Sequence, residues 1–271
     1  MIFSPMSRWM LRLAMVLGLG VIYVPLGIVL LNSFNADRTF AWPPPSLTLE
    51  WWTKAWDNEG AREALFTSVR TGLGATAIAL VLGSMVAFAV ARFSFFGREA
   101  ISLLVVLPIA LPGIVTGIAL DSAYQSVIRP LGVQKGLFWV IVGHATFCVV
   151  VVYNNLLARL RRLGGNFAEA SADLGALPWQ TFRYVTFPLI RSALFAGALL
   201  AFALSFDEII VTTFTAGPGV QTLPIWIFSN LFRPNQAPVI NVVAAVLIVL
   251  SIVPIYIAQR LSADSAAGGR L

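Results

Sequence analysis

Two adjacent carboxylates, Asp207 and Glu208, lie inside an apolar run that covers residues 192–214. An ionised carboxylate in the hydrocarbon core of a bilayer costs at least about 2.5–3.5 kcal/mol, so it is expected to face a cavity or an ionic partner. A carboxylate pairs with the charge of an alkylammonium group and accepts its N–H donors. The pair therefore predicts either an acidic lining for a cationic substrate or an ion pair, within the chain or with another subunit. Neighbouring residues on a helix point about 100° apart, so at most one of the two has to face a pathway squarely.

Three further residues are candidates for related chemistry. Phe206 could offer its ring face to the same cation, although a lipid-facing or packed phenylalanine is the commoner role. Asp121, near the outer end of the run 101–122, is a weaker pathway candidate that could simply lie at the interface. His144 is the only histidine, and a lone histidine among apolar residues more often packs with satisfied hydrogen bonds than binds a ligand. No cluster has metal-ligand spacing and no nucleophile–base arrangement is visible, so neither a metal site nor an enzyme is predicted.

The elements that position these residues are predicted to be membrane helices. Hydrophobic residues make up 58% of the chain and charged residues only 11%, whereas roughly a quarter of a soluble domain is charged. Apolar runs of about 20 residues cross a hydrocarbon core about 30 Å thick as helices, while spanning strands would alternate over about ten residues. We predict an all-α integral membrane protein, one domain over residues 1–271, with spans at about 10–32, 66–91, 101–122, 136–157, 192–214 and 239–259.

The distribution of basic residues predicts the orientation of the chain. Eleven of the 18 Lys and Arg residues lie on the side that holds both termini, and seven lie on the other. Cytoplasmic loops carry the excess of Lys and Arg, so both termini are predicted to be cytoplasmic. The first run follows Arg8 and Arg12 without a small-residue cleavage site, which favours a retained helix over a signal peptide. The basic residues sit at the ends of apolar runs, a placement that fits topology better than a nucleic-acid patch.

Residues 158–190 form a polar insert between two apolar runs, on the predicted cytoplasmic side. Asn166 is a good N-cap, and Glu169 follows three residues later, where its carboxylate can reach free N–H groups at the helix start. We expect a short helix over about 167–174 and a left-handed turn at Gly175.

A second helix of the insert is predicted from Pro178, a residue suited to the first helical position, to about Phe187. Leu177 is a poor N-cap for it, and nothing in the sequence explains that choice. The whole hairpin could rest on lipid as an amphipathic element or dock against a cytoplasmic partner. The chain has no Gly-x-x-x-x-Gly-Lys-Ser/Thr loop and so does not bind ATP by that route. Energy from ATP would have to come from another polypeptide, seated at this insert.

The insert also resembles a known family. Glu169-Ala170-Ser171, then Gly175, then Val185-Thr186-Phe187-Pro188 is similar to the Glu-Ala-Ala…Gly…Ile-x-Leu-Pro loop of permease subunits from binding-protein-dependent ABC importers. In that family the loop fits a groove on the ATPase subunit and transmits its closure to the membrane helices. Ser171, Val185 and Phe187 depart from the pattern by small-for-small or apolar-for-apolar exchanges. The resemblance implies the type I importer permease fold, and an ATPase-coupling role for Glu169, Ala170, Ser171, Gly175 and Pro188.

The resemblance extends over nearly the whole chain, to the second permease subunit of the polyamine-type importers. That branch includes putrescine, spermidine and 4-aminobutyrate systems. The segments that carry it are Asn32-Ser33-Phe34-Asn35, Glu50-Trp51-Trp52, His144-Ala145-Thr146-Phe147-Cys148, Ser205-Phe206-Asp207-Glu208 and residues 217–224.

Several of these residues gain expected roles from the resemblance. Ser205, Asp207 and Glu208 match the family's Ser-x-Asp-Asp/Glu pattern, which implies a place in the substrate pathway. Trp51 matches a tryptophan of the family's external segment and could border the entrance, although anchoring at the headgroup layer is at least as common. Some relatives carry an acid where this chain has Gly113, and that departure argues against a spermidine-like substrate.

The resemblance also implies an assembly in a bacterial inner membrane. The expected partners are a homologous permease, two copies of an ATPase that would carry ATP and Mg²⁺, and an extracytoplasmic solute-binding protein; no cofactor is expected on this chain. The expected solute is a small amine, putrescine before spermidine. Two alternatives remain open. One is an importer permease for another solute, such as a 4-aminobutyrate-like zwitterion, an anion or an iron complex. The other is a stand-alone secondary transporter that uses the same acids as proton or ion sites.

Overall fold

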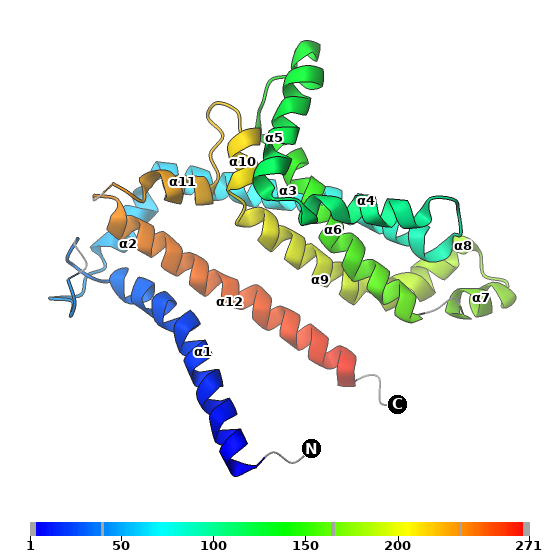
Figure 1. The fold of residues 1–271 in the computed structure, drawn as a ribbon, viewed down its shortest axis with the longest axis horizontal. Helices are drawn as coiled ribbons and strands as arrows, with labels where there is room; N and C mark the ends of the chain where they lie inside the picture. The colour runs from blue at the N-terminus through cyan, green and yellow to red at the C-terminus, as the bar shows by residue number, and fades with distance from the viewer. Residues whose placement is uncertain (1–3, 39–40, 164–165, 234, 268–271) are drawn as a thin grey trace. The chain divides into compact units, whose positions relative to one another are not determined.

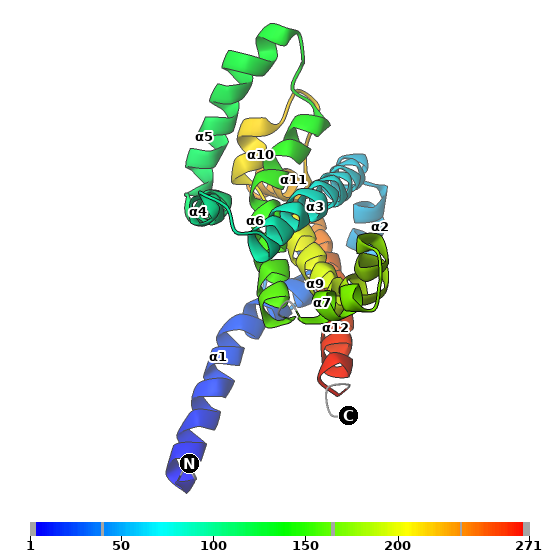
Figure 2. The same cartoon turned by 90° about the vertical axis from the view of Figure 1, so that its right-hand side faces the viewer.

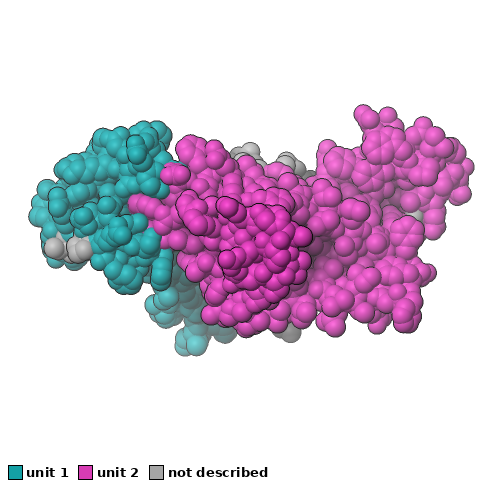
Figure 3. Space-filling view, turned by 90° about the horizontal axis from the view of Figure 1, so that it is seen from above, with its two compact units in different colours: residues 1–62, 227–256 teal, residues 63–226, 257–271 magenta. Residues whose placement is uncertain are grey.

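The computed structural model describes residues 4–38, 41–163, 166–233 and 235–267, and over these ranges the chain is helical, without a β-strand. Figure 1 shows this all-α architecture, which confirms the predicted fold class. The chain divides into two compact units, coloured in Figure 3: residues 1–62 with 227–256, and residues 63–226 with 257–271.

The first unit contains α1 (Pro5–Asn32), α2 (Glu50–Asp57) and the greater part of α12 (Ala237–Ala267). Helix α1 begins after Ser4, whose hydroxyl accepts the Ser7 N–H at 3.2 Å, with Pro5 at its first position. Its apolar side chains remain largely exposed within the chain, as expected for a helix that faces lipid or another subunit. The 18-residue window that marks it as a span has none of its residues buried.

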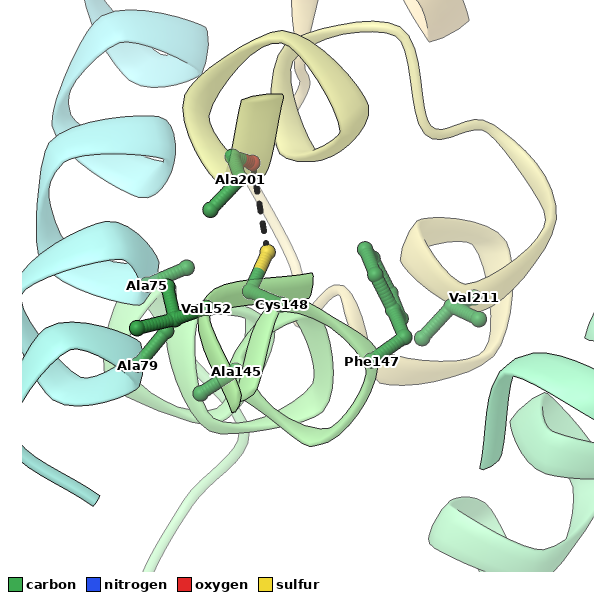
Figure 4. Close-up of a cluster of buried hydrophobic side chains, with 8 residues drawn as sticks. All are labelled: Ala75, Ala79, Ala145, Phe147, Cys148, Val152, Ala201 and Val211. Atoms are coloured by element: carbon green, nitrogen blue, oxygen red, sulfur yellow. Dashed lines mark hydrogen bonds between the residues drawn. The ribbon is translucent and has the colours of Figure 1, made fainter. Parts of the chain in front are cut away.

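The second unit is built around α6 (Leu137–Leu163), which carries a long row of buried side chains. Helices α4 (Arg98–Ala110), α9 (Phe187–Phe206) and α10 (Ile210–Thr215) pack on α6, as does α3 (Glu59–Arg92) through a buried cluster, and α5 (Gly113–Ala123) packs on α10. Small residues let these helices approach closely. Figure 4 shows one such cluster, in which alanines of α3 and α9 surround Cys148 of α6, whose thiol donates to the Ala201 carbonyl at 3.3 Å. Shorter helical segments elsewhere in the chain are Tyr124–Ile128, Arg129–Leu131 and α11 (Leu223–Asn230).

Among the residues that the structure describes, four helices are long and apolar enough to cross a membrane: Met6–Asn32, Glu59–Arg92, Leu137–Leu163 and Pro178–Phe206. A fifth candidate is the pair Arg98–Ala110 and Gly113–Leu131, and α12 contains a shorter apolar helix, Ala237–Ile252. The predicted runs 10–32, 66–91 and 136–157 each correspond to one long helix. The count of six spans stays a prediction.

The predicted run 101–122 is not one straight helix. It bends by 106° between α4 and α5, at Leu111-Pro112. Leu111 is extended, with ψ 145°, because a residue that precedes proline is kept out of the helical region. Pro112 then serves as the N-cap residue of α5. A sharp break therefore replaces the continuous span that the apolar pattern predicts.

Candidate functional site

The two acids lie in a break between α9 and α10. Helix α9 ends at Phe206, Asp207 is its C-cap residue, and α10 begins at Ile210. The prediction of a continuous helix over 192–214 is therefore wrong. In the described chain, the backbone N–H of Asp207 bonds to the Ala203 carbonyl at 3.3 Å, and no backbone bond follows for Glu208. Both acids thus sit on non-helical backbone.

The two carboxylates have different surroundings. Glu208 is half-buried, and its Oε1 accepts the N–H of Val211 at 2.9 Å, so it satisfies a free donor in the first turn of α10. Asp207 is exposed, and among the described residues its carboxylate has no hydrogen-bond or ion-pair partner. One acid therefore serves local structure, and the other is free for a ligand.

The position of Asp207 is electrostatically costly for the fold. The C-terminal end of a helix carries partial negative charge, so a carboxylate there is destabilising and a cation is stabilising. Asp207 adds a full negative charge at the end of the 20-residue helix α9. Residues that break a local rule in this way are expected at functional sites. The arrangement is suited to an ammonium group, whose positive charge would offset both the charge of the carboxylate and the partial negative charge of the helix end.

Ser205 and Phe206, the other predicted pathway residues of this segment, point elsewhere. Ser205 is buried, and its Oγ lies 2.7 Å from Nδ1 of His144 on α6. Phe206 is half-buried and contacts the Phe202 ring, with centroids 5.7 Å apart. Within the described chain, neither side chain is a hydrogen-bond or ring partner of the Asp207 carboxylate. Their pathway role stays a prediction.

Helix α5 packs directly on α10, as Figures 1 and 2 both show. A Cβ on Gly117 would lie 2.4 Å from the Phe214 ring, so only glycine permits this approach. Gly113 faces Ile210, where a Cβ would make an ordinary contact at 3.7 Å. Helix α5 thus packs on the helix that follows the acidic break, most closely at Gly117.

Asp121, the remaining acid among the candidates, is held in an ion pair with Lys135. The Lys135 ammonium also donates to the Phe214 carbonyl at 2.8 Å, and it lies 5.1 Å from the centroid of the Tyr124 ring. Lys135 therefore joins the end of α5 to the end of α10. The sequence does not indicate this partner, because the two residues are 14 positions apart and share no helix. The carboxylate of Asp121 is therefore already paired within the chain. Its role as a pathway residue stays a prediction.

We expect Lys135→Met to destabilise the permease domain by about 1–3 kcal/mol, because it leaves the partly buried Asp121 carboxylate without its cation. The measurement is the unfolding temperature of the purified protein in detergent. The double variant Lys135→Met/Asp121→Asn should recover part of the loss. A double variant less stable than Lys135→Met alone would contradict this account.

Trp51 belongs to the first unit, on helix α2. Its side chain is 5% exposed, and its Nε1 donates to the Asn35 carbonyl at 2.9 Å. The Lys54 ammonium lies 4.6 Å from the ring centroid, and the hydrogen bond and charge of Lys54 lower the pKa of Glu50 on the same helix. Trp51 thus links α2 to the segment that follows α1. Its predicted place at the entrance stays a prediction.

The polar insert forms the predicted hairpin. Helix α7 runs over Asn166–Asp173, and Gly175 follows with φ +80° in the left-handed region. Pro178 is the first residue of the short helix α8 (Pro178–Gln180). The hydroxyls of Ser171 and Thr181 lie 3.0 Å apart and join the two arms. Glu169 and Ala170 belong to α7, which has no buried residue, and residues 164 and 165, before the predicted N-cap, lie outside the described ranges.

The second arm does not end at Phe187 as predicted. It continues through a π-helical segment, Thr181–Thr186, directly into α9. Pro188 lacks an N–H and clashes with the preceding turn, and a π-segment, in which Phe187 N–H bonds to the Phe182 carbonyl, accommodates it. Nε of Arg159 on α6 donates to the Leu189 carbonyl at 2.8 Å. The hairpin and α9 therefore form one continuous element.

The hairpin presents apolar side chains to its surroundings. Leu174, beside the Gly175 turn, is 88% exposed, and Leu177 and Trp179 are each 64% exposed. Behind them, Phe182 packs against Trp179 and against Phe88 of α3, with ring centroids 5.8 and 6.1 Å apart. The tip thus exposes apolar side chains, and aromatic contacts to α3 support it from behind. Such a surface is suited to protein docking.

Comparison with known proteins agrees with this arrangement. The family described as "Binding-protein-dependent transport system inner membrane component" matches residues 79–266. The chain belongs to this family. The permease is also 30% identical to the spermidine/putrescine transport system permease protein PotC of Haemophilus influenzae, over 95% of this chain and 98% of the relative.

Two further relatives and one solved structure complete the comparison. The permease is 31% identical to the putrescine transport system permease protein PotI of Escherichia coli, over 89% and 86% of the two chains. It is 29% identical to the putative 2-aminoethylphosphonate transport system permease protein PhnV of Salmonella typhi, over 88% and 89%. A chain of a bacterial ABC transporter involved in the import of the acidic polysaccharide alginate shares the fold, with a TM-score of 0.65 at 16% identity and coverage of 97% and 99%.

Membership settles the class of the protein. It is a multi-pass inner membrane component of a solute transport system, with the fold of an ABC transporter permease. A secondary transporter that needs no binding protein, one of the alternatives left open by the sequence, does not fit this family.

Proposed function

We propose that this permease carries a small alkylammonium solute, putrescine before spermidine, as one of two permease subunits of an ATP-driven importer. The observation that carries the proposal is the exposed Asp207 carboxylate at the C-terminal end of α9, unpartnered within the described chain. The names of the relatives PotC and PotI, which are spermidine/putrescine and putrescine permeases, support the same solute class. A zwitterion is the second candidate, because PhnV is named for 2-aminoethylphosphonate.

The proposal includes partners and an orientation. Two ATPase subunits bind ATP and Mg²⁺ below the permease pair, and an ATPase subunit docks on the hairpin 166–188. A homologous permease completes the pathway, and a solute-binding protein delivers the solute from outside. Both termini and the hairpin face the cytoplasm, in keeping with the excess of basic residues on that side. The exposed apolar tip of the hairpin and its continuity with α9 support the docking role.

The geometry suggests how closure of the ATPase reaches the solute. Helix α9 has 20 residues and so extends about 30 Å from the hairpin to the acidic break. A displacement of the hairpin moves the near end of a rigid helix whose far end carries Asp207. The pathway then changes its access from outside to inside while the carboxylate exchanges its ammonium partner for water.

The test is uptake by the reconstituted complex. The permease is purified with its partner permease and ATPase, placed in proteoliposomes, and supplied with its binding protein and radiolabelled putrescine. We expect ATP-dependent uptake that unlabelled putrescine inhibits more strongly than spermidine, 4-aminobutyrate or 2-aminoethylphosphonate. Stronger inhibition by either zwitterion would overturn the amine assignment, and uptake without ATP would overturn the coupling.

A further inference from the structure

His144 lies in the N-terminal third of α6, fully buried, and contacts the end of α9 and the start of α10. Its Nδ1 is 2.7 Å from Oγ of Ser205, the next-to-last residue of α9. Its Nε2 is 2.8 Å from Oγ1 of Thr212 in α10. One imidazole ring thus contacts the helices on both sides of the acidic break.

The donors and acceptors of this network can be assigned by counting protons. The Thr212 hydroxyl donates to the Glu208 carbonyl at 2.8 Å, so its only proton is used there. It must then accept from Nε2–H of His144. A neutral imidazole has one donor and one acceptor, so Nδ1 accepts the proton of the Ser205 hydroxyl. The bonds run in one direction, from Ser205 through His144 and Thr212 to the backbone of Glu208, and such buried chains reinforce one another.

This bridge fits only the broken form of the segment. In a continuous helix, Ser205 and Thr212 would be seven residues and about 10 Å apart along the axis. Bonds of 2.7 and 2.8 Å to a single ring do not span that distance. A straightened segment would lose at least one of the two bonds and leave a buried polar group unsatisfied, which is costly.

We propose that His144 is a positioning residue, which holds the α9–α10 break open and thereby places Asp207 for an alkylammonium solute. The inference rests on the proposed function. Asp207 lies between two anchored points, Ser205 and the Glu208 carbonyl, both fixed by the His144 chain. His144 itself is buried and acts through the backbone, without contact to the solute.

The first readout is structural and needs no transport. Hydrogen–deuterium exchange of the intact complex in nanodiscs is followed for peptides that cover residues 207–216. We expect His144→Ala to speed exchange there about tenfold, because α10 has only six residues and loses its anchor to α6. The matched control is Tyr153→Phe, which removes another hydrogen bond of α6, 2.6 Å to Ser102, away from the break. It should leave these peptides unchanged.

The second readout is putrescine taken up per ATP hydrolysed in proteoliposomes. We expect His144→Ala and Asp207→Asn each to lower this ratio by at least about tenfold, while ATP hydrolysis stimulated by the binding protein persists. The double variant should be no worse than either single variant, because both remove the same placed carboxylate. Tyr153→Phe should keep the wild-type ratio.

Each outcome separates the two proposals. The positioning role alone would be overturned if hydrogen exchange were unchanged in His144→Ala. It would also be overturned if the losses of uptake per ATP in His144→Ala and Asp207→Asn multiplied in the double variant. A second outcome is that exchange changes in His144→Ala but the wild-type complex does not take up putrescine. This would overturn the proposed solute and leave the positioning role of His144 standing. If His144→Ala does not assemble, Ser205→Ala and Thr212→Val each remove one bond and keep the ring. Wild-type exchange and uptake in both would overturn the inference.

Discussion

Gly175→Ala is expected to reduce putrescine uptake about tenfold while the permease remains in the membrane. Gly175 has φ +80°, and a Cβ placed there would meet nothing within 4 Å. The cost of alanine is therefore backbone strain alone, about 1–2 kcal/mol, which corresponds to roughly a tenfold loss of the hairpin conformation that docks. Uptake and binding-protein-stimulated ATP hydrolysis should fall together, because docking of the hairpin on the ATPase couples the two processes.

The chain offers a matched control for this strain. Gly97, before α4, has φ +85°, and a Cβ added to it would also meet nothing within 4 Å. Gly97→Ala should therefore carry the same backbone cost without the loss of ATP stimulation. Gly175→Asn should be milder than Gly175→Ala, since asparagine tolerates the left-handed region. Equal activity of Gly175→Ala and Gly97→Ala would remove the hairpin turn from the coupling step.

The hairpin could be predicted from the sequence because its determinants are local. A glycine in a left-handed turn and a proline in the first position of a helix act on their own backbone, and both lie where expected. Leu177, a poor cap by residue type, is served by Gln180, whose Oε1 accepts the Leu177 N–H at 2.8 Å. That glutamine stands three residues on, as half of a capping box. The predicted end at Phe187 is wrong because a π-segment carries the helix past Pro188.

The acidic break could not be predicted, because nothing local marks it. No glycine or proline lies in residues 205–212, and the apolar pattern continues on both sides. The residue that holds the break is His144, which is 61 residues from Ser205 and 68 from Thr212. The expectation that this histidine is packed with satisfied hydrogen bonds is confirmed. Its position across the break depends on the packing of α6 against α9 and α10, which a single sequence does not display.

Asp207→Asn is expected to lower putrescine uptake by roughly ten- to a hundredfold, the value of one charge-assisted hydrogen bond of about 1.5–3 kcal/mol. Glu208→Gln is the matched control. It also removes one negative charge, but the glutamine Oε1 can still accept the Val211 N–H that Glu208 accepts at 2.9 Å. If the charge of the free carboxylate is what the solute needs, the two neutralisations should differ strongly in uptake.

Stability should move in the opposite direction from activity in Asp207→Asn. Removal of a negative charge from the C-terminal end of α9 relieves an unfavourable interaction with the helix dipole, about 0.3–1 kcal/mol for an exposed group. The variant should therefore unfold at the same or a slightly higher temperature in detergent while its uptake collapses. If the Asp207 carboxylate served packing instead, its removal would lower both the unfolding temperature and the uptake. A fall in unfolding temperature that accompanies the loss of uptake would make Asp207 a structural residue and return the solute site to Glu208 or Asp121.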